Sequence, residues 1–293
     1  MDTIIESIAT GNPAERKSQT DAAEFMQQVT SIPQPIRDRI ERIYEGTGID
    51  YRYSGIADYN REVEEFSFFP KNWELEPAPS TAERNEKYRE IVLPLMEQVA
   101  GEALDRSETA PREITHLITV SCTGFFAPGP DIELVKRLGL PPSTARTMIG
   151  FMGCYAAFNG LRAAHAFCQA DPEARVLLVC AELCTLHFQI DDTLENAIVN
   201  ALFSDGAAAA VLSPRPAGQP RGSWRYVGGR SELDDDSMEE MTWDIGNEGF
   251  NMGLSPRVSE VVADRLPAYL EALLQTHGWA RETLDFWAVH PGG

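Results

Sequence analysis

Short apolar runs alternate with longer amphipathic stretches through the middle of the chain, between residues 114 and 212. The runs are rich in valine, leucine, isoleucine and alanine, which is typical of strands buried on both faces of a sheet. The stretches between them carry apolar residues at helical spacing. Strands are therefore predicted at 114–120, 147–152, 175–181 and 207–212, and helices at 131–138 and 156–169. This alternation predicts an α/β sheet with helices on both faces.

The N-terminal part has a different pattern. Residues 1–65 read as a strand followed by helices, with one break at Pro33 and Pro35. Residues 66–80 are rich in aromatic residues and proline, which indicates a loop. A long helix with its charges on one side is predicted at 81–104.

The pattern restarts after a segment rich in proline and glycine at 213–223, which reads as a linker. Strands are predicted at 224–227 and 286–289, an acidic loop at 232–240, and a helix at 256–276. A second half that begins like the first and then stops predicts two domains. The first covers 1–218, and 219–293 is the start of an incomplete second one.

Composition and charge exclude several classes of protein. The 293 residues are 43% hydrophobic and 24% charged, an ordinary globular composition, and the net charge of −20 argues against nucleic acid or anionic membrane as partners. No secretory signal or membrane-spanning run is visible. The five cysteines include no CxxC pair and no cluster with metal-ligand spacing, so we expect free thiols, no metal and a cytoplasmic location.

Two residues far apart in the sequence suggest covalent chemistry. Cys154 follows a short apolar strand and opens a helix of small residues, where backbone N–H groups and the helix dipole favour a thiolate. His290 lies at the predicted carboxyl end of a strand, where α/β proteins place their chemistry. Each alone has an ordinary structural explanation, a core cysteine and a surface histidine. Together they predict acyl transfer, with Cys154 as nucleophile and His290 supporting the charge.

Several motifs in order resemble the type III polyketide synthases, the chalcone synthase-like family. They are Gly153-Cys154-Tyr155-Ala156-Ala157, Leu202-Phe203-Ser204-Asp205-Gly206 and His290-Pro291-Gly292-Gly293, together with the segments Cys122-Thr123-Gly124-Phe125 and Trp243-Asp244-Ile245-Gly246. The resemblance covers essentially the whole chain and points to the bacterial branch, with its alkylpyrone and alkylresorcinol synthases. It implies a thiolase-like αβαβα sandwich, here with its second half incomplete, and a homodimer.

The resemblance also implies a reaction and residue roles. An acyl group from coenzyme A loads onto Cys154, malonyl-CoA is decarboxylated, and repeated condensation gives a polyketide. His290 matches the histidine that stabilises the enolate and the thioester oxyanion, and Phe203 matches an aromatic gatekeeper between the CoA tunnel and the acyl cavity. Coenzyme A thioesters are the substrates, and no cofactor is implied.

Arg39 and Arg42 match two basic residues that contact CoA, while a third such position falls on Gly46. Without the resemblance, a solvated helix face explains both arginines equally well. The family's catalytic asparagine lies beyond the last residue of this chain. We therefore expect a fragment of a longer protein or a broken copy, inactive and poorly stable as it stands.

Starter choice is predicted from the positions that match the acyl cavity, which are Cys122, Thr123, Ala127, Cys184 and His187. Cys184 and Ala127 replace larger residues of plant chalcone synthases, and each methylene that they let the cavity bury contributes about 0.8 kcal/mol. This predicts a medium-to-long acyl-CoA starter. Cys122 keeps open a malonyl-CoA starter with a tetrahydroxynaphthalene-type product.

Two further functions stay open. A β-ketoacyl-carrier-protein synthase III also pairs cysteine with histidine on a thiolase fold, but it performs one condensation on a carrier protein. A non-catalytic module that binds CoA or dimerises would fit the missing asparagine, although the intact Cys154 and His290 argue against it.

Overall fold

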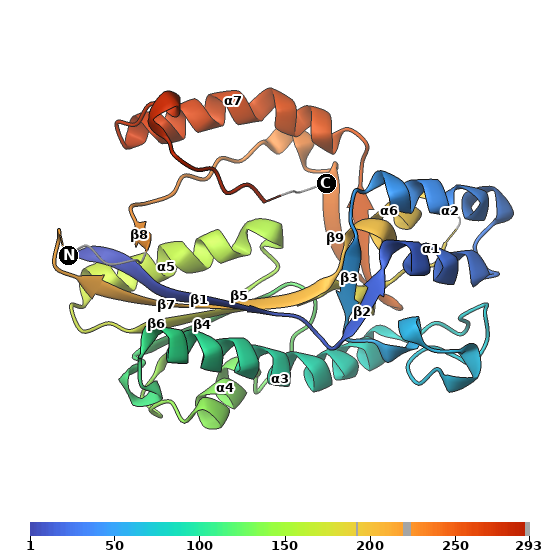
Figure 1. Cartoon of the computed structure of the whole chain (residues 1–293), viewed down its shortest axis with the longest axis horizontal. Coiled ribbons are helices and arrows are strands. Elements are labelled where there is room, and N and C mark those ends of the chain that lie inside the picture. The colour runs from blue at the N-terminus through green and yellow to red at the C-terminus, as the bar shows by residue number, and fades with distance from the viewer. Residues whose placement is uncertain (192, 219–223, 291–293) are drawn as a thin grey trace.

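A computed structural model describes residues 1–191, 193–218 and 224–290 (Figure 1). Its centre is a six-stranded sheet with the order β5-β4-β6-β7-β1-β8. The strands are β1 (Asp2–Gly11), β4 (His116–Ser121), β5 (Ala145–Gly150), β6 (Val176–Leu183), β7 (Asp205–Arg215) and β8 (Trp224–Tyr226). β4 is parallel to β5 and β6, whereas β7 is antiparallel to β6 and β1. The expected α/β architecture is therefore confirmed.

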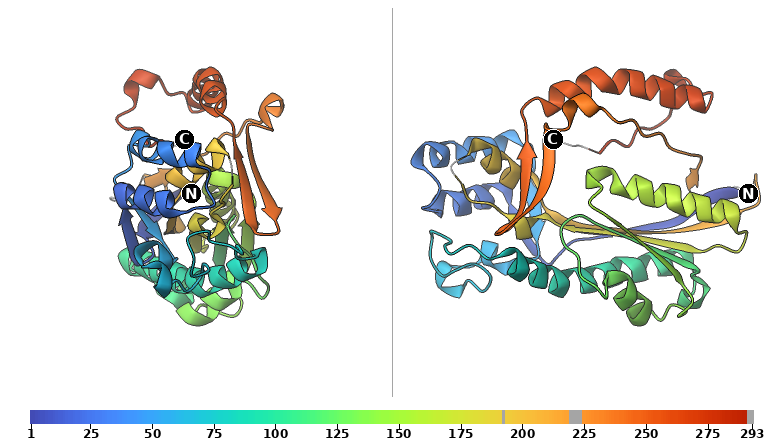
Figure 2. Two further views of the ribbon diagram at one scale, coloured as in Figure 1. Left: turned by 90° about the vertical axis from the view of Figure 1, so that its right-hand side faces the viewer. Right: turned by 180° about the vertical axis from the view of Figure 1, so that it is seen from behind.

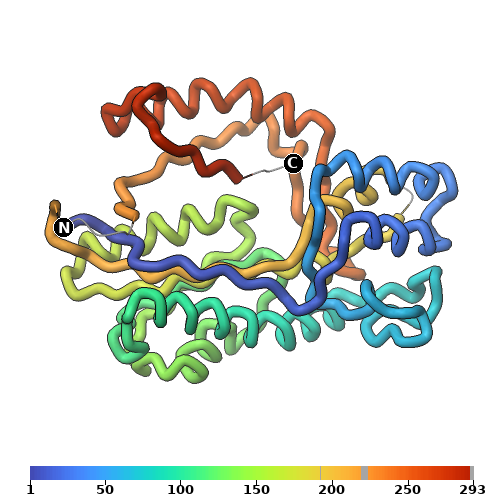
Figure 3. The backbone as a smooth tube through the Cα atoms, viewed as in Figure 1, coloured from blue at the N-terminus to red at the C-terminus, as the bar shows by residue number. Residues whose placement is uncertain are grey.

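Helices cover the two faces of this sheet, as the ribbon and tube views show (Figures 1 and 3). α3 (Thr81–Ser107) and α4 (Pro130–Leu138) lie on one face, and α5 (Ala156–Ala170) lies on the other. Alternate residues of β4 serve the two cores: Leu117 packs with the α3 side and Ile118 with the α5 side. α5 approaches β6 closely because Gly160 has no side chain, and a Cβ there would lie 2.6 Å from Cδ1 of Leu178.

A group of short elements extends one end of the sheet (Figure 2). It contains α1 (Gln19–Gln28), α2 (Gln34–Gly46) and α6 (Leu194–Leu202), with the antiparallel pair β2 (Glu15–Ser18) and β3 (Tyr51–Ser54). The sequence predicts α1 and α2 in this region but neither α6 nor the β2–β3 pair. Four residues in each strand are too few for a period to show.

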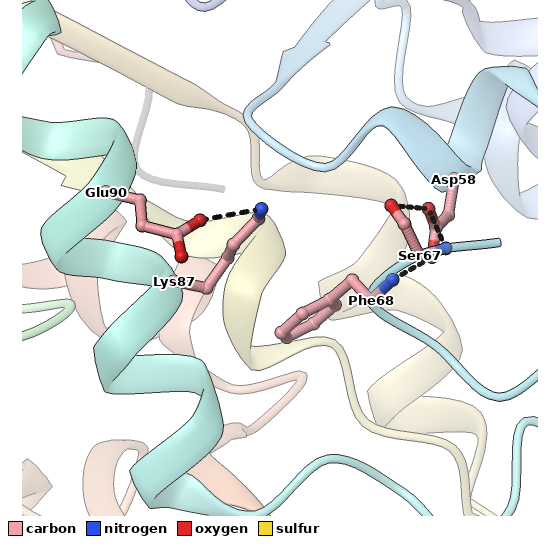
Figure 4. Close-up of polar contacts among 5 residues, drawn as sticks. All are labelled: Asp58, Ser67, Phe68, Lys87 and Glu90. Atoms are coloured by element: carbon pink, nitrogen blue, oxygen red, sulfur yellow. Dashed lines mark hydrogen bonds and ion pairs between the residues drawn. The ribbon is translucent and has the colours of Figure 1, made fainter.

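The predicted loop at 66–80 is confirmed, and one buried carboxylate holds its start. Asp58 accepts hydrogen bonds from the backbone N–H groups of Ser67 at 2.9 Å and Phe68 at 2.8 Å, and from the Ser67 hydroxyl at 3.0 Å (Figure 4). Nearby, Lys87 and Glu90 form an exposed ion pair at 2.9 Å (Figure 4). The anchored loop presents Phe66 and Phe69 to an aromatic cluster around Phe25 and Tyr59.

After residue 223 the chain forms a hairpin of β9 (Met241–Gly246) and β10 (Gly249–Leu254), then α7 (Val258–Thr276). The helix was predicted at 256–276 and is confirmed. The hairpin lies where the sequence predicts no strands. The predicted strand at 286–289 is wrong, because these residues are exposed and belong to no sheet. A strand needs a partner, and none of the described strands pairs with this segment. Within the described residues, no helix has the length and apolarity needed to cross a membrane.

Candidate active site

A cavity of about 390 Å³ lies where the carboxyl ends of β4 and β6 meet the first turn before α5. Six of the residues singled out in the sequence line it: Cys122, Thr123, Cys154, Cys184, His187 and Phe203. The β9–β10 hairpin adds Trp243 and Phe250 to its wall. Segments far apart in the chain therefore converge on one space, large enough for a small organic ligand.

Cys154 lies in the 3₁₀ turn Gly153–Tyr155, which leads directly into α5. Gly153 has a φ of +68°, a conformation that favours glycine, so the chain turns sharply and leaves the cysteine exposed at the cavity. The pKa of Cys154 is raised, first by desolvation and then by the negative charge of Glu182, while the cysteine's own backbone N–H opposes the shift. The expectation of a thiolate stabilised by the helix terminus is thus not met. Apolar surroundings and a nearby carboxylate outweigh the single N–H group.

Glu182 was not singled out in the sequence. Its carboxylate accepts hydrogen bonds from the backbone N–H of Cys122 at 2.8 Å and from the Thr123 hydroxyl at 2.7 Å. Burial raises the pKa of Glu182, and these hydrogen bonds lower it again. An acidic residue directly after an apolar strand was the signal that could have identified it.

His187 is a fixed, neutral part of the wall. Its Nε2 donates to the carbonyl of Thr123 at 2.7 Å, and its Nδ1 accepts from the backbone N–H of Phe250 at 3.0 Å. The ring stacks on Phe250 with centroids 4.1 Å apart. Burial lowers the pKa of His187 to about 4, so the imidazole is uncharged at neutral pH. Its two nitrogens join the loop after β4 to the β9–β10 hairpin.

Two further thiols line the cavity. Desolvation raises the pKa of both Cys122 and Cys184, and the charge of Glu182 adds to the shift in each case. The carbonyl of Cys122 accepts a hydrogen bond from Nε1 of Trp243 at 2.9 Å, which ties the hairpin to this wall. Both cysteines therefore act as small protonated wall residues at neutral pH.

Phe203 is half-buried directly after α6 and reaches the cavity. Its carbonyl accepts a hydrogen bond from Nη1 of Arg52 at 3.0 Å, and that guanidinium lies over the ring of Tyr44. The cavity wall is mainly apolar, and it includes Ala22, Phe25, Met26, Phe188 and Val199.

Four sequence-predicted residues lie outside the residues that line the cavity. Ala127 is exposed in the loop after β4, because Phe126 packs inward on Tyr88 and turns its neighbour outward. Arg39 and Arg42 are exposed on the outer side of α2, whose inner side carries Tyr44. His290 is exposed in the extended segment after α7, and the other three residues of its His-Pro-Gly-Gly motif are outside the described residues.

Comparison with known proteins decides the family. The model of the chalcone and stilbene synthases, N-terminal domain, matches residues 2–216. The chain belongs to the chalcone and stilbene synthase family. This range holds the whole central sheet except β8, and it holds Cys154, Glu182 and Phe203.

Relatives and solved structures agree with this assignment. The α-pyrone synthesis polyketide synthase-like Pks18 of Mycobacterium tuberculosis is 30% identical over 292 residues, 99% of this chain and 72% of that protein. The 1,3,6,8-tetrahydroxynaphthalene synthase of Streptomyces peucetius is 28% identical over 300 residues, 99% of this chain and 74% of that one. The crystal structure of PKS-I from the brown alga Ectocarpus siliculosus has a TM-score of 0.94 at 34% identity, covering 100% of this chain and 77% of that one. The chain therefore shares the thiolase-like fold of the type III polyketide synthases.

A chalcone and stilbene synthase with this geometry has the parts for one chemical step within the described residues. The exposed thiol of Cys154 faces a largely apolar cavity that can hold an acyl chain. Attack of a thiolate on a thioester carbonyl transfers the acyl group to the protein. Water exclusion by the apolar wall protects the product of that step.

Proposed function

We propose that this protein is a type III polyketide synthase that loads an acyl group from acyl-CoA onto Cys154 and extends it with malonyl-CoA. The observation that carries the proposal is the position of one exposed thiol at a cavity with a mainly apolar wall. In the loading step, the sulfur of Cys154 bonds to the acyl carbonyl carbon and the bond from that carbon to the CoA sulfur breaks. The proton of the Cys154 thiol ends on the CoA thiol.

Extension then uses the decarboxylation of malonyl-CoA. Carbon dioxide leaves, and the electron pair of the broken C–C bond forms an enolate on the acetyl thioester. This carbon attacks the acyl carbonyl on Cys154, a new C–C bond forms, and the cysteine leaves as a thiolate. Negative charge develops on thioester oxygens in both steps, so N–H donors at the cavity accelerate them.

His290 remains the proposed partner of Cys154 in these steps. The proposal rests on the sequence resemblance, since the His290 side chain is exposed and outside the residues that line the cavity. The roles of Arg39 and Arg42 in holding the CoA phosphates rest on the same resemblance and on their exposure on α2.

A medium-to-long acyl-CoA starter belongs to the proposal. The same cavity is lined by apolar side chains of α1 and α6, including Phe25, Met26 and Val199. Each methylene buried there contributes about 0.8 kcal/mol to binding. Ala127 does not contribute to this wall in the chain as described.

A homodimer and a division of the chain near residue 218 complete the proposal. β5 is an edge strand of the sheet, and Met148 on it is 40% exposed, as is Phe151 directly after it. A second copy of the chain would cover the edge of β5 and these two apolar side chains. Light scattering of the purified chain tests the dimer, and limited proteolysis tests the division.

Mass spectrometry of the intact protein tests the main proposal. Incubation with decanoyl-CoA is expected to add one decanoyl group to the wild type, and Cys154→Ser is expected to gain none. Cys168→Ser is the matched control, because Cys168 is buried in α5 away from the cavity and burial raises its pKa to about 11. Equal labelling of the wild type and Cys154→Ser would refute the role of Cys154.

The raised pKa of Cys154 favours one second candidate, a module that binds acyl-CoA without reacting. Such a module would be stabilised against heat by decanoyl-CoA and would show no adduct at any pH. An adduct that appears as the pH rises through the thiol pKa would exclude it.

A further inference from the structure

The segment between α6 and β7 is fastened to β3 by its backbone and side chains. Besides the hydrogen bond from Arg52 to the Phe203 carbonyl, the Ser204 hydroxyl accepts from the backbone N–H of Tyr53 at 2.8 Å. The same hydroxyl donates to the Tyr53 carbonyl at 2.9 Å. Phe203 is thereby held in register with the strand beside it.

Asp205, two residues further, connects this segment to a second wall of the cavity. Its carboxylate is buried, with 3% of the residue exposed, and it accepts from the backbone N–H of Gly55 at 2.7 Å. It also accepts from the backbone N–H of Thr185 at 2.8 Å and from the Thr185 hydroxyl at 2.7 Å. Thr185 follows Cys184 directly, so one carboxylate joins β3, β7 and the Cys184 wall.

The neighbours of Thr185 extend this connection. Its hydroxyl lies 2.7 Å from the Ser54 hydroxyl, and its carbonyl accepts from the Tyr59 hydroxyl at 3.1 Å. Asp205 has no ion-pair partner within 4.0 Å among the described side chains. A buried carboxylate held by N–H and O–H donors alone depends on each of them, because an unpaired buried donor is costly.

We propose that Asp205 is a positioning residue that sets the width of the acyl cavity by fixing Phe203 and Cys184 relative to β3. The inference rests on the proposed function, because it concerns which starters reach Cys154. Asp205 does not line the cavity and acts only through these neighbours. Loss of its bonds would leave Cys154 in place and alter the space for the acyl chain.

Protonation of Asp205 would weaken the same connection. Burial raises the pKa of Asp205 to about 6, while its hydrogen bonds to Thr185 and Gly55 lower it. The charged or titratable groups that face it are Arg52 on β3, Tyr59 before the 66–80 loop, and Cys184 after β6. A protonated carboxyl donates from one of its two oxygens, so below about pH 6 the three bonds that Asp205 accepts cannot all be kept, and one of them is lost or reversed.

The test compares the loading of Cys154 by decanoyl-CoA and by acetyl-CoA, followed as adduct mass over time. Asp205→Asn has the shape of the protonated acid, so its preference for the long starter is expected to change by roughly tenfold near pH 8. Wild type is expected to approach the variant as the pH falls to about 5, since its own carboxyl is then protonated. The variant itself is expected to show no such change over that range.

Thr185→Val and Thr185→Ser provide a second pair that keeps the carboxylate. Valine removes the hydroxyl donor and is expected to shift the starter preference in the same direction as Asp205→Asn. Serine retains the hydroxyl and is expected to restore the wild-type preference.

Three results would overturn the proposal. They are an unchanged preference in Asp205→Asn, a difference between variant and wild type that is the same at all pH values, and equal effects of Thr185→Val and Thr185→Ser. If Asp205→Asn does not fold, the Thr185 pair alone decides. Failure of the proposed function is distinguishable, because wild type would then form no adduct with either thioester.

Discussion

The carboxylate of Glu182 raises the pKa of the Cys154 thiol across the same cavity, adding to the larger effect of desolvation. Glu182 is held in place by the backbone N–H of Cys122 and the hydroxyl of Thr123. The Cys154 thiol is therefore less ionised at neutral pH than a helix terminus alone would make it. Binding of a substrate or a positive group near Cys154 would have to offset this charge.

Replacement of Glu182 is the direct check. Glu182→Gln removes the negative charge and is expected to lower the pKa of Cys154, so that alkylation by iodoacetamide becomes faster at neutral pH. The midpoint of the rate against pH should fall without returning to that of a free thiol, because desolvation remains. Glu86→Gln, on the outer face of α3, is the control and should leave the profile unchanged. An unaltered midpoint in Glu182→Gln would contradict the electrostatic coupling.

His187 is expected to make stability depend on pH. Its pKa of about 4 in the folded chain lies below the ordinary value of about 6.5, because burial disfavours the imidazolium. Folding thus favours the neutral ring, and this contribution is fully present above about pH 6.5 and lost as the pH falls toward 4. The shift corresponds to about 3 kcal/mol.

Urea unfolding of wild type and His187→Asn between about pH 7.5 and 4.5 measures this effect. The difference in unfolding free energy should shrink as the pH falls. Comparing the two proteins removes the contribution of Asp205, whose raised pKa has the opposite effect on stability over the same range. A difference that does not vary with pH would show that His187 is not a buried neutral ring.

Substitutions at Cys184 and Ala127 test which of these two residues lies beside the acyl chain of a long starter. Cys184→Phe should fill the passage between Cys154 and the apolar wall of α1 and α6, and reduce loading by decanoyl-CoA by roughly tenfold or more with little effect on acetyl-CoA. Ala127→Met should leave both rates unchanged in the monomer, since Ala127 is exposed. The reverse pattern would place the long chain beside Ala127.

The contact between Gly160 in α5 and Leu178 in β6 holds the helix that follows Cys154 against the sheet. Gly160→Ala places a methyl group 2.6 Å from Cδ1 of Leu178, and is expected to destabilise the fold by about 1–3 kcal/mol. Leu178→Ala should make room, so the double variant should lose less than the sum of the two single losses. Additive losses, measured by urea unfolding, would argue against this contact.

The sequence predicts the central fold well because its strands are nearly continuous apolar runs. The runs ending in β4, β6 and β7 and the helices α3, α4, α5 and α7 all lie where the hydrophobic pattern puts them. The β9–β10 hairpin was missed because only some of its residues are buried, and Phe250 is held by His187 from a distant segment. Such tertiary contacts leave no period in the sequence.

The candidate site shows the same division. Cys154 was found from local sequence and Phe203 from the family resemblance, and both reach the cavity. Glu182 and Asp205 were missed because their importance lies in hydrogen bonds to segments far along the chain. His290 cannot be placed at the cavity from its motif, since a strand end positions a side chain only when the strand is paired.

The β9–β10 hairpin limits where the chain can be cut without opening the cavity. Trp243 and Phe250 come from a hairpin that follows the range matched by the chalcone and stilbene synthase N-terminal domain, which ends at residue 216. A piece cut at that point would keep Cys154 but lose these two aromatic side chains, and the cavity would be more open to bulk water. An acyl group bound to such a piece is expected to hydrolyse faster than the same group on the longer chain.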